Sequence, residues 1–328
     1  MEYILAFVGV TVTTAGSLVV IWFLDRFEKE PVWLLALVFI WGAVPAVILS
    51  LIAEGMFGIP LGFLVEEGVA NVVMGSLVAP VVEESAKALA LLAVFFLLRN
   101  QLDDVMDGIV FGAVVGAGFA WIEDVLYVCS AFKTGGLEGM GTVFFIRVFV
   151  FGLNHAFFTA LAGLGFGLAR LSRSCWVGGL AVLGFFGLAM GAHFLHNTLV
   201  GVFQEEGLII SFVTHWMGVI GLACVIVIAW IIEFKWIREE LREECPRGTI
   251  GERDYKQVTK WFGRLGWELR FLAAFDVVGF FRVRKMFNLL VKLAFVKRAY
   301  RRRPTAANQR SVEELRAKVA KCRAAFAS

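Results

Sequence analysis

Charged residues are scarce in this 328-residue chain: Asp, Glu, Lys and Arg make up 18% of it, whereas hydrophobic residues make up 59%. With a mean hydropathy of +0.78, this composition excludes a soluble globular domain. Apolar runs of roughly twenty residues recur through residues 1–236, and such runs are typical of helices that cross a membrane. We expect seven spans, at about residues 3–24, 32–53, 76–98, 108–131, 140–169, 176–203 and 207–236.

Cysteine is also sparse, and its placement excludes two kinds of site. The five cysteines are scattered and contain no Cys-x-x-Cys pair, so they form neither a disulfide scaffold nor a cysteine metal cluster. The usual helical zinc signature, His-Glu-x-x-His, is missing as well. The N-terminus lacks the basic region and small-residue cleavage site of a removable signal peptide, so we expect the first span to be retained.

The charges that are present divide the chain into two parts. Residues 1–236 hold 9 Lys or Arg and 18 Asp or Glu, whereas residues 237–328 hold 22 and 10. We therefore predict a transmembrane domain over 1–236 and, over 237–328, a basic cytoplasmic tail of amphipathic helices that lies on anionic lipid. The arginines at 301–303 fit a lipid contact better than nucleic acid. Ser311, three residues before Glu314, indicates a capping box that starts a last helix.

Orientation follows from the Lys and Arg residues of the loops. They are concentrated in the loops that share a side with the tail, which places the N-terminus outside and the C-terminus inside. The predicted fold is therefore all-α, a polytopic membrane helical bundle of about seven transmembrane helices. A multi-pass protein of this kind is expected in the plasma (cell inner) membrane.

Polar side chains interrupt the predicted spans. Charge in hydrocarbon costs several kcal/mol per group, so it is seldom present without a function. The alternative for the third span is a helix start, because Pro80 suits a first turn and acidic residues suit the positive N-terminal end of a helix. The polar residues are Glu83, Glu84, Lys87, Glu123, Asp124, Arg147, His155, His193, His196, Asn197 and His215.

These side chains fall at similar depths once the topology is applied. At about 1.5 Å per residue from the outer end, Glu84 lies roughly 6–12 Å deep, Glu123 about 12 Å and His193 about 15 Å. His155 is nearest the middle. We interpret this convergence as one shared site in the outer half of the membrane, with Arg147 as a counter-ion for the carboxylates.

The residue types suit hydrolysis of an amide bond. His193 and Asn197 are four residues apart and share a helix face. A neutral imidazole can ligate a metal or shuttle a proton, an asparagine amide can donate to an oxyanion, and a carboxylate opposite them can act as general base for a water. We expect His196 and His215 to make interhelical hydrogen bonds instead.

The same residues carry a resemblance to a known family. Glu83-Glu84-Ser85-Ala86-Lys87 resembles the Glu-Glu-x-x-Lys motif of the PrsW family of intramembrane proteases, and residues 119–123 resemble its Phe-Ala-x-x-Glu motif. Arg147 with His155 and the following Thr159 resembles a third conserved region of the family, and residues 193–197 match its His-x-x-x-Asn element. The resemblance covers about residues 20–205. The PrsW family is similar in turn to CAAX prenyl proteases and bacteriocin-immunity membrane proteases.

The resemblance implies an intramembrane endopeptidase in which Glu83 is the base that activates water, assisted by Glu84. The resemblance also implies that His193 and Asn197 stabilise the oxyanion. Whether Glu123 or His155 partners Glu83 stays open. Lys87, Arg147 and His155 are expected to support these groups.

Metal dependence is left open at this point. Family names often include "metalloprotease", and His155, His193 and Glu84 would supply the three protein ligands of a catalytic zinc while leaving a position for water. A paired-glutamate mechanism needs no metal. The cofactor is therefore none or one divalent metal, with zinc as the candidate.

The implied partner is a single-span membrane protein, similar to an anti-sigma factor, cut in or near its extracytoplasmic juxtamembrane segment. Two other functions compete. A proton-coupled transporter also buries Glu and His residues, but no internal duplication of the kind transporters show is present. A non-catalytic scaffold would bind partners through small-residue faces such as Gly108, Gly112 and Gly116, which we expect to allow close helix packing.

Overall fold

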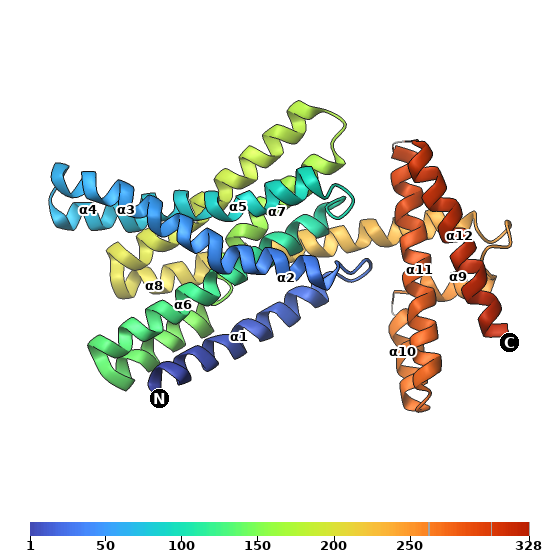
Figure 1. The fold of residues 1–328 in the computed structure, drawn as a ribbon, viewed down its shortest axis with the longest axis horizontal. Coiled ribbons are helices and arrows are strands. Elements are labelled where there is room, and N and C mark those ends of the chain that lie inside the picture. Colours follow the sequence, from blue (N-terminus) through green and yellow to red (C-terminus); the bar gives the residue numbers. More distant parts are fainter. Residues whose placement is uncertain (262, 303, 328) are drawn as a thin grey trace. The chain divides into compact units, whose positions relative to one another are not determined.

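The computed structural model describes residues 1–261, 263–302 and 304–327 and is helical, with no strand in those ranges. Arg303 therefore lies outside the described residues. The chain forms two compact units. One, here the membrane unit, comprises Met1–Asp25 and Lys29–Ile226; the other, here the tail unit, comprises Arg26–Glu28 and Val227–Ser328. The prediction of an all-α polytopic membrane bundle is confirmed (Figure 1).

The second span is longer than predicted. After α1 (Glu2–Leu24), the helices α2 (Val32–Trp41) and α3 (Val47–Leu64) are joined by the π-helical turn η1 (Gly42–Ala46). Pro45 lies in that turn, where its missing N–H would break a regular α-helical ladder. Together they make one apolar stretch of 33 residues, Val32–Leu64. The predicted end at residue 53 is therefore wrong, and Glu54 lies inside an apolar helix rather than in a loop.

The third predicted span also belongs to a longer helix. After the turn at Val65 and Glu66, α4 (Glu67–Val73), the π-helical η2 (Met74–Val78) and α5 (Ala79–Leu97) follow without a break (Figure 1). Helical chain thus begins well before Glu83 and Glu84. The helix-start interpretation of these acids is wrong, because they lie in the middle of a helix and not at its positive end.

The next two passes form an antiparallel pair. Helix α6 (Val105–Val143) begins with a capping box between Asp104 and Asp107 and reverses at Gly136, whose φ of 61° is a conformation that side-chain-bearing residues rarely adopt. The returning chain contains η3 (Phe144–Val150) and α7 (Asn154–Leu171).

Glycines allow α6 and α7 to touch through their backbones. A Cβ added to Gly112 would lie 2.9 Å from the Cα of Ala160, and one added to Gly116 would lie 2.8 Å from the Cα of Ala156. A Cβ on Gly108 would lie 2.9 Å from the carbonyl carbon of Gly163. The expectation of close packing at these glycines is confirmed.

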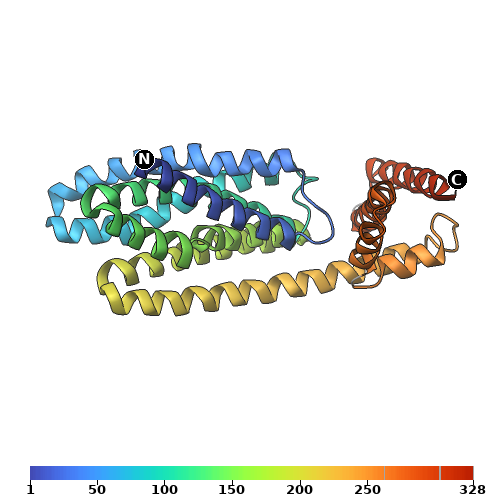
Figure 2. The ribbon, with the colours of Figure 1, turned by 90° about the horizontal axis from the view of Figure 1, so that it is seen from below.

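Helix α8 (Cys175–Arg242) folds back on itself near residue 204. The imidazole Nδ1 of His196 lies 2.6 Å from the hydroxyl of Ser211, whereas fifteen residues of straight helix would separate them by about 22 Å. Figure 2 shows this reversal. Within the described parts of the chain, five stretches are long and apolar enough to cross a membrane, among them Cys175–Phe203 and Glu205–Arg242. The number of crossings and the orientation remain predictions.

The tail unit has a hydrophobic core of its own. Its helices are the end of α8, α9 (Glu252–Val258), α10 (Gly263–Ala273), α11 (Val277–Arg302) and α12 (Ala306–Ala327). Their buried residues form one cluster, which includes Leu241, Leu290, Leu293 and Val319. The predicted capping box is wrong. The backbone N–H of Asn308 donates to Thr305 Oγ1 at 3.2 Å, so α12 begins earlier and the hydroxyl of Ser311, inside the helix, donates to the carbonyl of Ala307.

Candidate active site

Helix α5 presents two carboxylates and an ammonium on one buried face. Lys87 is four residues after Glu83 and three after Glu84, and the side chains of Glu83, Glu84 and Lys87 are 7%, 0% and 0% exposed. The Lys87 Nζ lies 2.8 Å from Glu84 Oε1 and 3.3 Å from Glu83 Oε2. It also lies 3.9 Å from the centre of the Phe119 ring. The lysine therefore offsets part of the cost of burying two neighbouring carboxylates.

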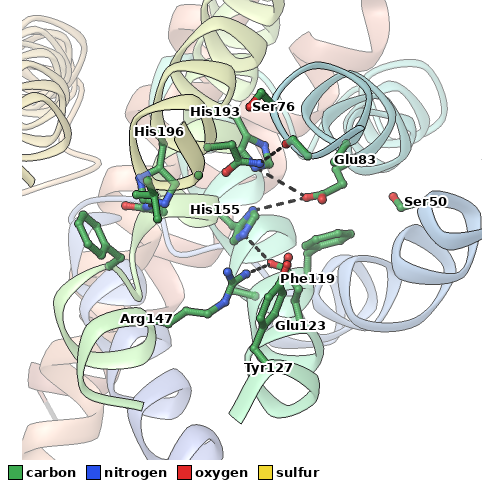
Figure 3. A pocket seen from close by; sticks show the side chains of 18 of the residues that line it. Ser50, Ser76, Glu83, Phe119, Glu123, Tyr127, Arg147, His155, His193 and His196 are labelled. Carbon is green, nitrogen blue, oxygen red and sulfur yellow. Dashed lines mark hydrogen bonds and ion pairs between the residues drawn. The ribbon is translucent and has the colours of Figure 1, made fainter. Parts of the chain in front are cut away.

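His155 of α7 joins this face to α6. Its Nδ1 lies 2.9 Å from Lys87 Nζ and its Nε2 lies 2.7 Å from Glu123 Oε2. Because an ammonium only donates, Nδ1 accepts from Lys87 and the ring proton is on Nε2, the nitrogen that faces Glu123. Figure 3 shows His155 between Glu83 and Glu123, with the imidazole Nδ1 3.9 Å from Glu83 Oε2.

Arg147 compensates the carboxylates of α6. Its Nη2 lies 2.6 Å from Glu123 Oε2, and its Nε donates to Asp124 Oδ1 at 2.9 Å. The guanidinium covers the ring of Tyr127, 3.7 Å from its centre. These contacts are those of the counter-ion that the sequence predicts. They also hold the Glu123 carboxylate against His155.

His193 of α8 completes the cluster. Its Nδ1 lies 3.1 Å from Glu84 Oε1, its ring stacks on Phe158, and Thr159 Oγ1 donates to Glu84 Oε2 at 3.1 Å. With the Nδ1–H donated to Glu84, Nε2 carries a lone pair and faces Glu83 Oε2 at 4.0 Å. His193 in this tautomer has no Nε2 proton to donate to an oxyanion. The geometry therefore favours His193 as a proton acceptor or a metal ligand over the oxyanion-stabilising role that the resemblance implies.

Three of these residues have the chemistry of a metal site. One ligand atom each from Glu83, His155 and His193 lies within 4.8 Å of the other two, and all three residues are buried. The set contains Glu83 rather than the expected Glu84, whose oxygens are engaged by Lys87, His193 and Thr159. Two imidazole nitrogens and one carboxylate are a donor set of catalytic zinc. At the usual bond lengths such atoms are about 3.3 Å apart, so binding requires a small contraction and the withdrawal of Lys87 from His155.

The charge of the cluster also suits a cation. Four carboxylates face two cations, which leaves two negative charges uncompensated in a buried place. Burying unpaired charge costs several kcal/mol per group, and either two protons or one divalent cation removes the excess. The donor set and the charge therefore both fit a divalent metal. The charged residues counted are Glu83, Glu84, Glu123, Asp124, Lys87 and Arg147.

The cluster borders a cavity of about 630 Å³ in the membrane unit. Asn197 lines the same cavity, but its amide donates to the carbonyl of Gly75 in η2 at 2.9 Å and does not touch the cluster. One N–H of that amide stays available for another acceptor. The remaining walls come from α3, α4, η2 and α8.

The other two histidines differ from each other. His196 bonds Asn154 Nδ2 at 3.0 Å and Ser211 in the returning half of α8, so its predicted hydrogen bond is confirmed. Among the described residues neither ring nitrogen of His215 has a hydrogen-bond partner, and the ring packs against Phe151 and Phe157. The hydrogen bond predicted for His215 is therefore wrong.

Sequence reasoning placed Thr159 in the third conserved region with Arg147 and His155 but gave it no role of its own, and it missed Asn154, Ser50 and Glu54. Thr159 donates to Glu84 and Asn154 bonds His196, and the available signal for Asn154 was only its position next to His155. Ser50 and Glu54 line the cavity from α3, but the polar stretch after residue 53 indicated a loop. The spacing of four residues between Ser50 and Glu54 would place them on one helix face. This signal can be used only when the helix is known to continue past residue 53.

The sequence is similar to that of known proteins. The model of a family described as "PrsW family intramembrane metalloprotease" matches residues 30–231. Protease PrsW of Clostridioides difficile (strain 630) is 31% identical over 115 residues, which cover 35% of this chain and 46% of that relative, so the match spans about half of the relative's length. No solved structure matches. Because the family model covers more than half of the chain, this chain belongs to the PrsW family of intramembrane metalloproteases.

Proposed function

We propose that this chain is an intramembrane endopeptidase that hydrolyses a peptide bond at the cavity beside Glu83. The observation that carries the proposal is the buried cluster itself: four helices bring Glu83, His155, His193 and Glu123 together at a cavity. Membership of a protease family supports the same reading. Ionisable groups buried in a membrane bundle at such a cost are a functional site by default.

Glu83 is the general base in this proposal. Its Oε2 and the His193 Nε2 lone pair are 4.0 Å apart, so one water hydrogen-bonds to both. As the water oxygen attacks the carbonyl carbon, its proton passes to Glu83, which then gives that proton to the departing amine. The second N–H of Asn197, on the same cavity, is the donor that we assign to the oxyanion.

The other cluster residues position these groups. Lys87 holds the Glu83 carboxylate in place through its hydrogen bond, while Glu84 sets the tautomer of His193 through its Nδ1–H. Glu123 likewise sets the tautomer of His155, and Arg147 forms an ion pair with Glu123. This arrangement of a reacting group oriented by a second and a third group recurs in activated active sites.

A divalent metal, with zinc as our candidate, would be held by Glu83, His155 and His193. When bound, it supplies Lewis acidity and lowers the pKa of an attached water. Lys87 would then have to release His155 Nδ1, since that nitrogen would be a ligand, and would keep Glu84 as an ion-pair partner.

The proposed substrate is a single-span membrane protein, similar to an anti-sigma factor, cut in its extracytoplasmic juxtamembrane segment, and the proposed location is the plasma membrane. The depth argument supports this choice, since the cluster falls in the predicted outer half of the bundle. A cavity of about 630 Å³ is within the usual range for a ligand site and suits a few residues of an unwound peptide.

The test is cleavage by the purified chain of a panel of single-span proteins, with each product's mass measured. We expect cuts confined to the extracytoplasmic half of the span or the residues just outside it. Cuts only on the cytoplasmic side contradict the proposed orientation. Proton flux in vesicles with no cleavage of any substrate contradicts the protease and favours a transporter.

We also propose that residues 1–236 and 237–328 act as a protease domain and a lipid-bound tail. The corner between α10 and α11 exposes large apolar side chains next to basic ones, a combination typical of contact with anionic lipid. Phe275 at this corner is 91% exposed and has a φ of 54°, unusual for a residue with a side chain. The apolar residues are Leu269, Phe275, Val277, Val278 and Phe281, and the basic ones are Arg270, Arg282 and Lys285.

Hydrogen exchange of the full chain in nanodiscs tests the lipid contact. We expect the amides of residues 270–282 to be better protected with phosphatidylglycerol than with phosphatidylcholine alone. The double variant Phe275→Ser and Phe281→Ser is expected to lose that difference. Equal protection of the wild type in both lipids contradicts the contact.

A further inference from the structure

Helix α3 gives the cavity a polar wall that the catalytic cluster does not use. Val47, Ser50, Leu51 and Glu54 all line the cavity, and their spacing places them along one face of the helix. Two of the four carry polar groups in a stretch that is otherwise apolar. The two groups, a hydroxyl and a carboxylate, are one helical turn apart.

The hydroxyl of Ser50 has no hydrogen-bond partner among the described residues, although the side chain is buried. Serines in helices commonly donate to the carbonyl four residues earlier. Ser17 and Ser85 do so in this chain, at 3.2 and 2.6 Å. Ser50 does not, and Figure 3 shows its oxygen pointing away from its own helix into the pocket. A buried hydroxyl without a partner is costly unless a ligand or water fills the role.

Glu54 is a second acceptor on the same face. It lies inside the apolar stretch Val32–Leu64 and lines the cavity, and its carboxylate makes no ion pair or hydrogen bond with another described residue. The two cations of the cluster are committed elsewhere: Lys87 pairs with Glu83 and Glu84, and Arg147, which lines the cavity, pairs with Glu123 and Asp124. The negative charge of Glu54 is thus available to a ligand.

We propose that Ser50 and Glu54 form a subsite that binds a basic side chain, lysine or arginine, of the peptide close to the bond that is cut. A carboxylate only accepts hydrogen bonds, and a hydroxyl readily accepts one, so the complementary ligand carries several donors and a positive charge. This inference rests on the proposed function, because it takes a peptide to be the ligand of the cavity.

Cleavage of matched substrates tests the subsite. In a single-span protein that the wild type cuts, each of the four residues on either side of the cut is replaced in turn by Lys, Gln or Glu. At one position we expect the lysine substrate to exceed the glutamine substrate in kcat/KM by about ten- to a hundredfold, the range for a hydrogen bond to a charged group. Glu54→Gln is expected to remove this preference, and Glu54→Lys to shift it to the glutamate substrate. Glu67→Gln, in α4 and not among the residues that line the cavity, is the matched control and should keep the preference.

Binding separates this inference from the proposed function. In the Glu83→Gln background, affinity for fluorescent single-span peptides is measured with Lys or Gln at each position, with and without Glu54→Gln. We expect at least tenfold tighter binding of one lysine peptide, lost when Glu54 is replaced. A lysine preference in binding, together with no cleavage of any substrate by the wild type, contradicts the protease and leaves the subsite standing. Cleavage or binding with no charge preference at any position, or a preference that survives Glu54→Gln, overturns the subsite.

Discussion

Replacing Gly116 by alanine tests how tightly the active-site geometry depends on backbone packing. Gly116 of α6 faces the turn of α7 that carries His155. An added Cβ would overlap the carbonyl oxygen of His155 and lie 2.5 Å from its carbonyl carbon and 2.8 Å from the Cα of Ala156. Ordinary contacts are 3.4–4 Å, and every atom met is backbone, so α7 must move by about 1 Å.

The consequences follow from the distances of His155. Its bonds to Glu123 and Lys87 are 2.7 and 2.9 Å, and a shift of about 1 Å takes both beyond hydrogen-bond length. Overpacking costs about 1–3 kcal/mol of folding stability, and the loss of the two contacts of His155 adds to that cost. Alanine has a higher helix propensity than glycine, but that gain is at most about 1 kcal/mol and does not offset the cost. A displacement of this size in an active site costs about a hundredfold in rate.

The assay is thermal unfolding in detergent together with substrate cleavage, and Gly184→Ala is the control. Gly184 lies in α8, and a Cβ there meets nothing within 4 Å, so the control should be as stable as the wild type or slightly more so. Gly116→Ala should unfold at lower temperature and cleave about a hundredfold more slowly. A Gly116→Ala variant that matches Gly184→Ala in both measurements refutes the reasoning.

Two further predictions concern charge. Burial opposes ionisation of Glu244, but its hydrogen bonds from Arg316 and Lys297 lower the pKa of its carboxyl from 4.5 to about 2. Its stabilisation of the tail unit, roughly 2 kcal/mol after allowance for solvent screening, is therefore complete above about pH 4.5 and lost as the pH falls toward 2. Hydrogen exchange of α11 and α12 should accelerate over that window in the wild type and less in Glu244→Gln, and an equal pH response of the two contradicts it. The second prediction concerns Lys87→Met, which removes the cation beside His155. We expect its zinc affinity, measured by competition with a chelator, to rise at least tenfold, and its cleavage activity to be abolished. An unchanged zinc affinity contradicts the metal site.

Much of the site could be predicted because its residues are rare in an apolar chain. Glu83 and Glu84 in the third span and His155 and His193 in later ones stand out, and the alternation of helix direction puts them at one depth. The choice of Glu83 rather than Glu84 beside both histidines could not be predicted, since it depends on side-chain orientation and on Thr159 and Lys87 engaging Glu84.

The limits of helices were harder to predict than the helices themselves. The turn η2 contains Gly75, whose carbonyl accepts from Asn197, and such π-helical turns have no clear sequence signal. Glu54 was assigned to a loop because charge normally marks the end of a span. In the tail, Ser311 and Glu314 matched a capping pattern, yet Thr305 occupied the capping role several residues earlier.

The most direct test of the central claim is cleavage of one single-span substrate by purified wild type, Glu83→Gln and Glu66→Gln, each with and without a strong chelator. Glu66 lies in the turn before α4, away from the cavity lining, so its variant controls for the loss of one carboxylate. We predict full activity in Glu66→Gln and, at an unchanged unfolding temperature, at least a thousandfold loss in Glu83→Gln, the upper part of the range for a general base. A fully active Glu83→Gln chain would contradict the assignment of catalysis to this cluster.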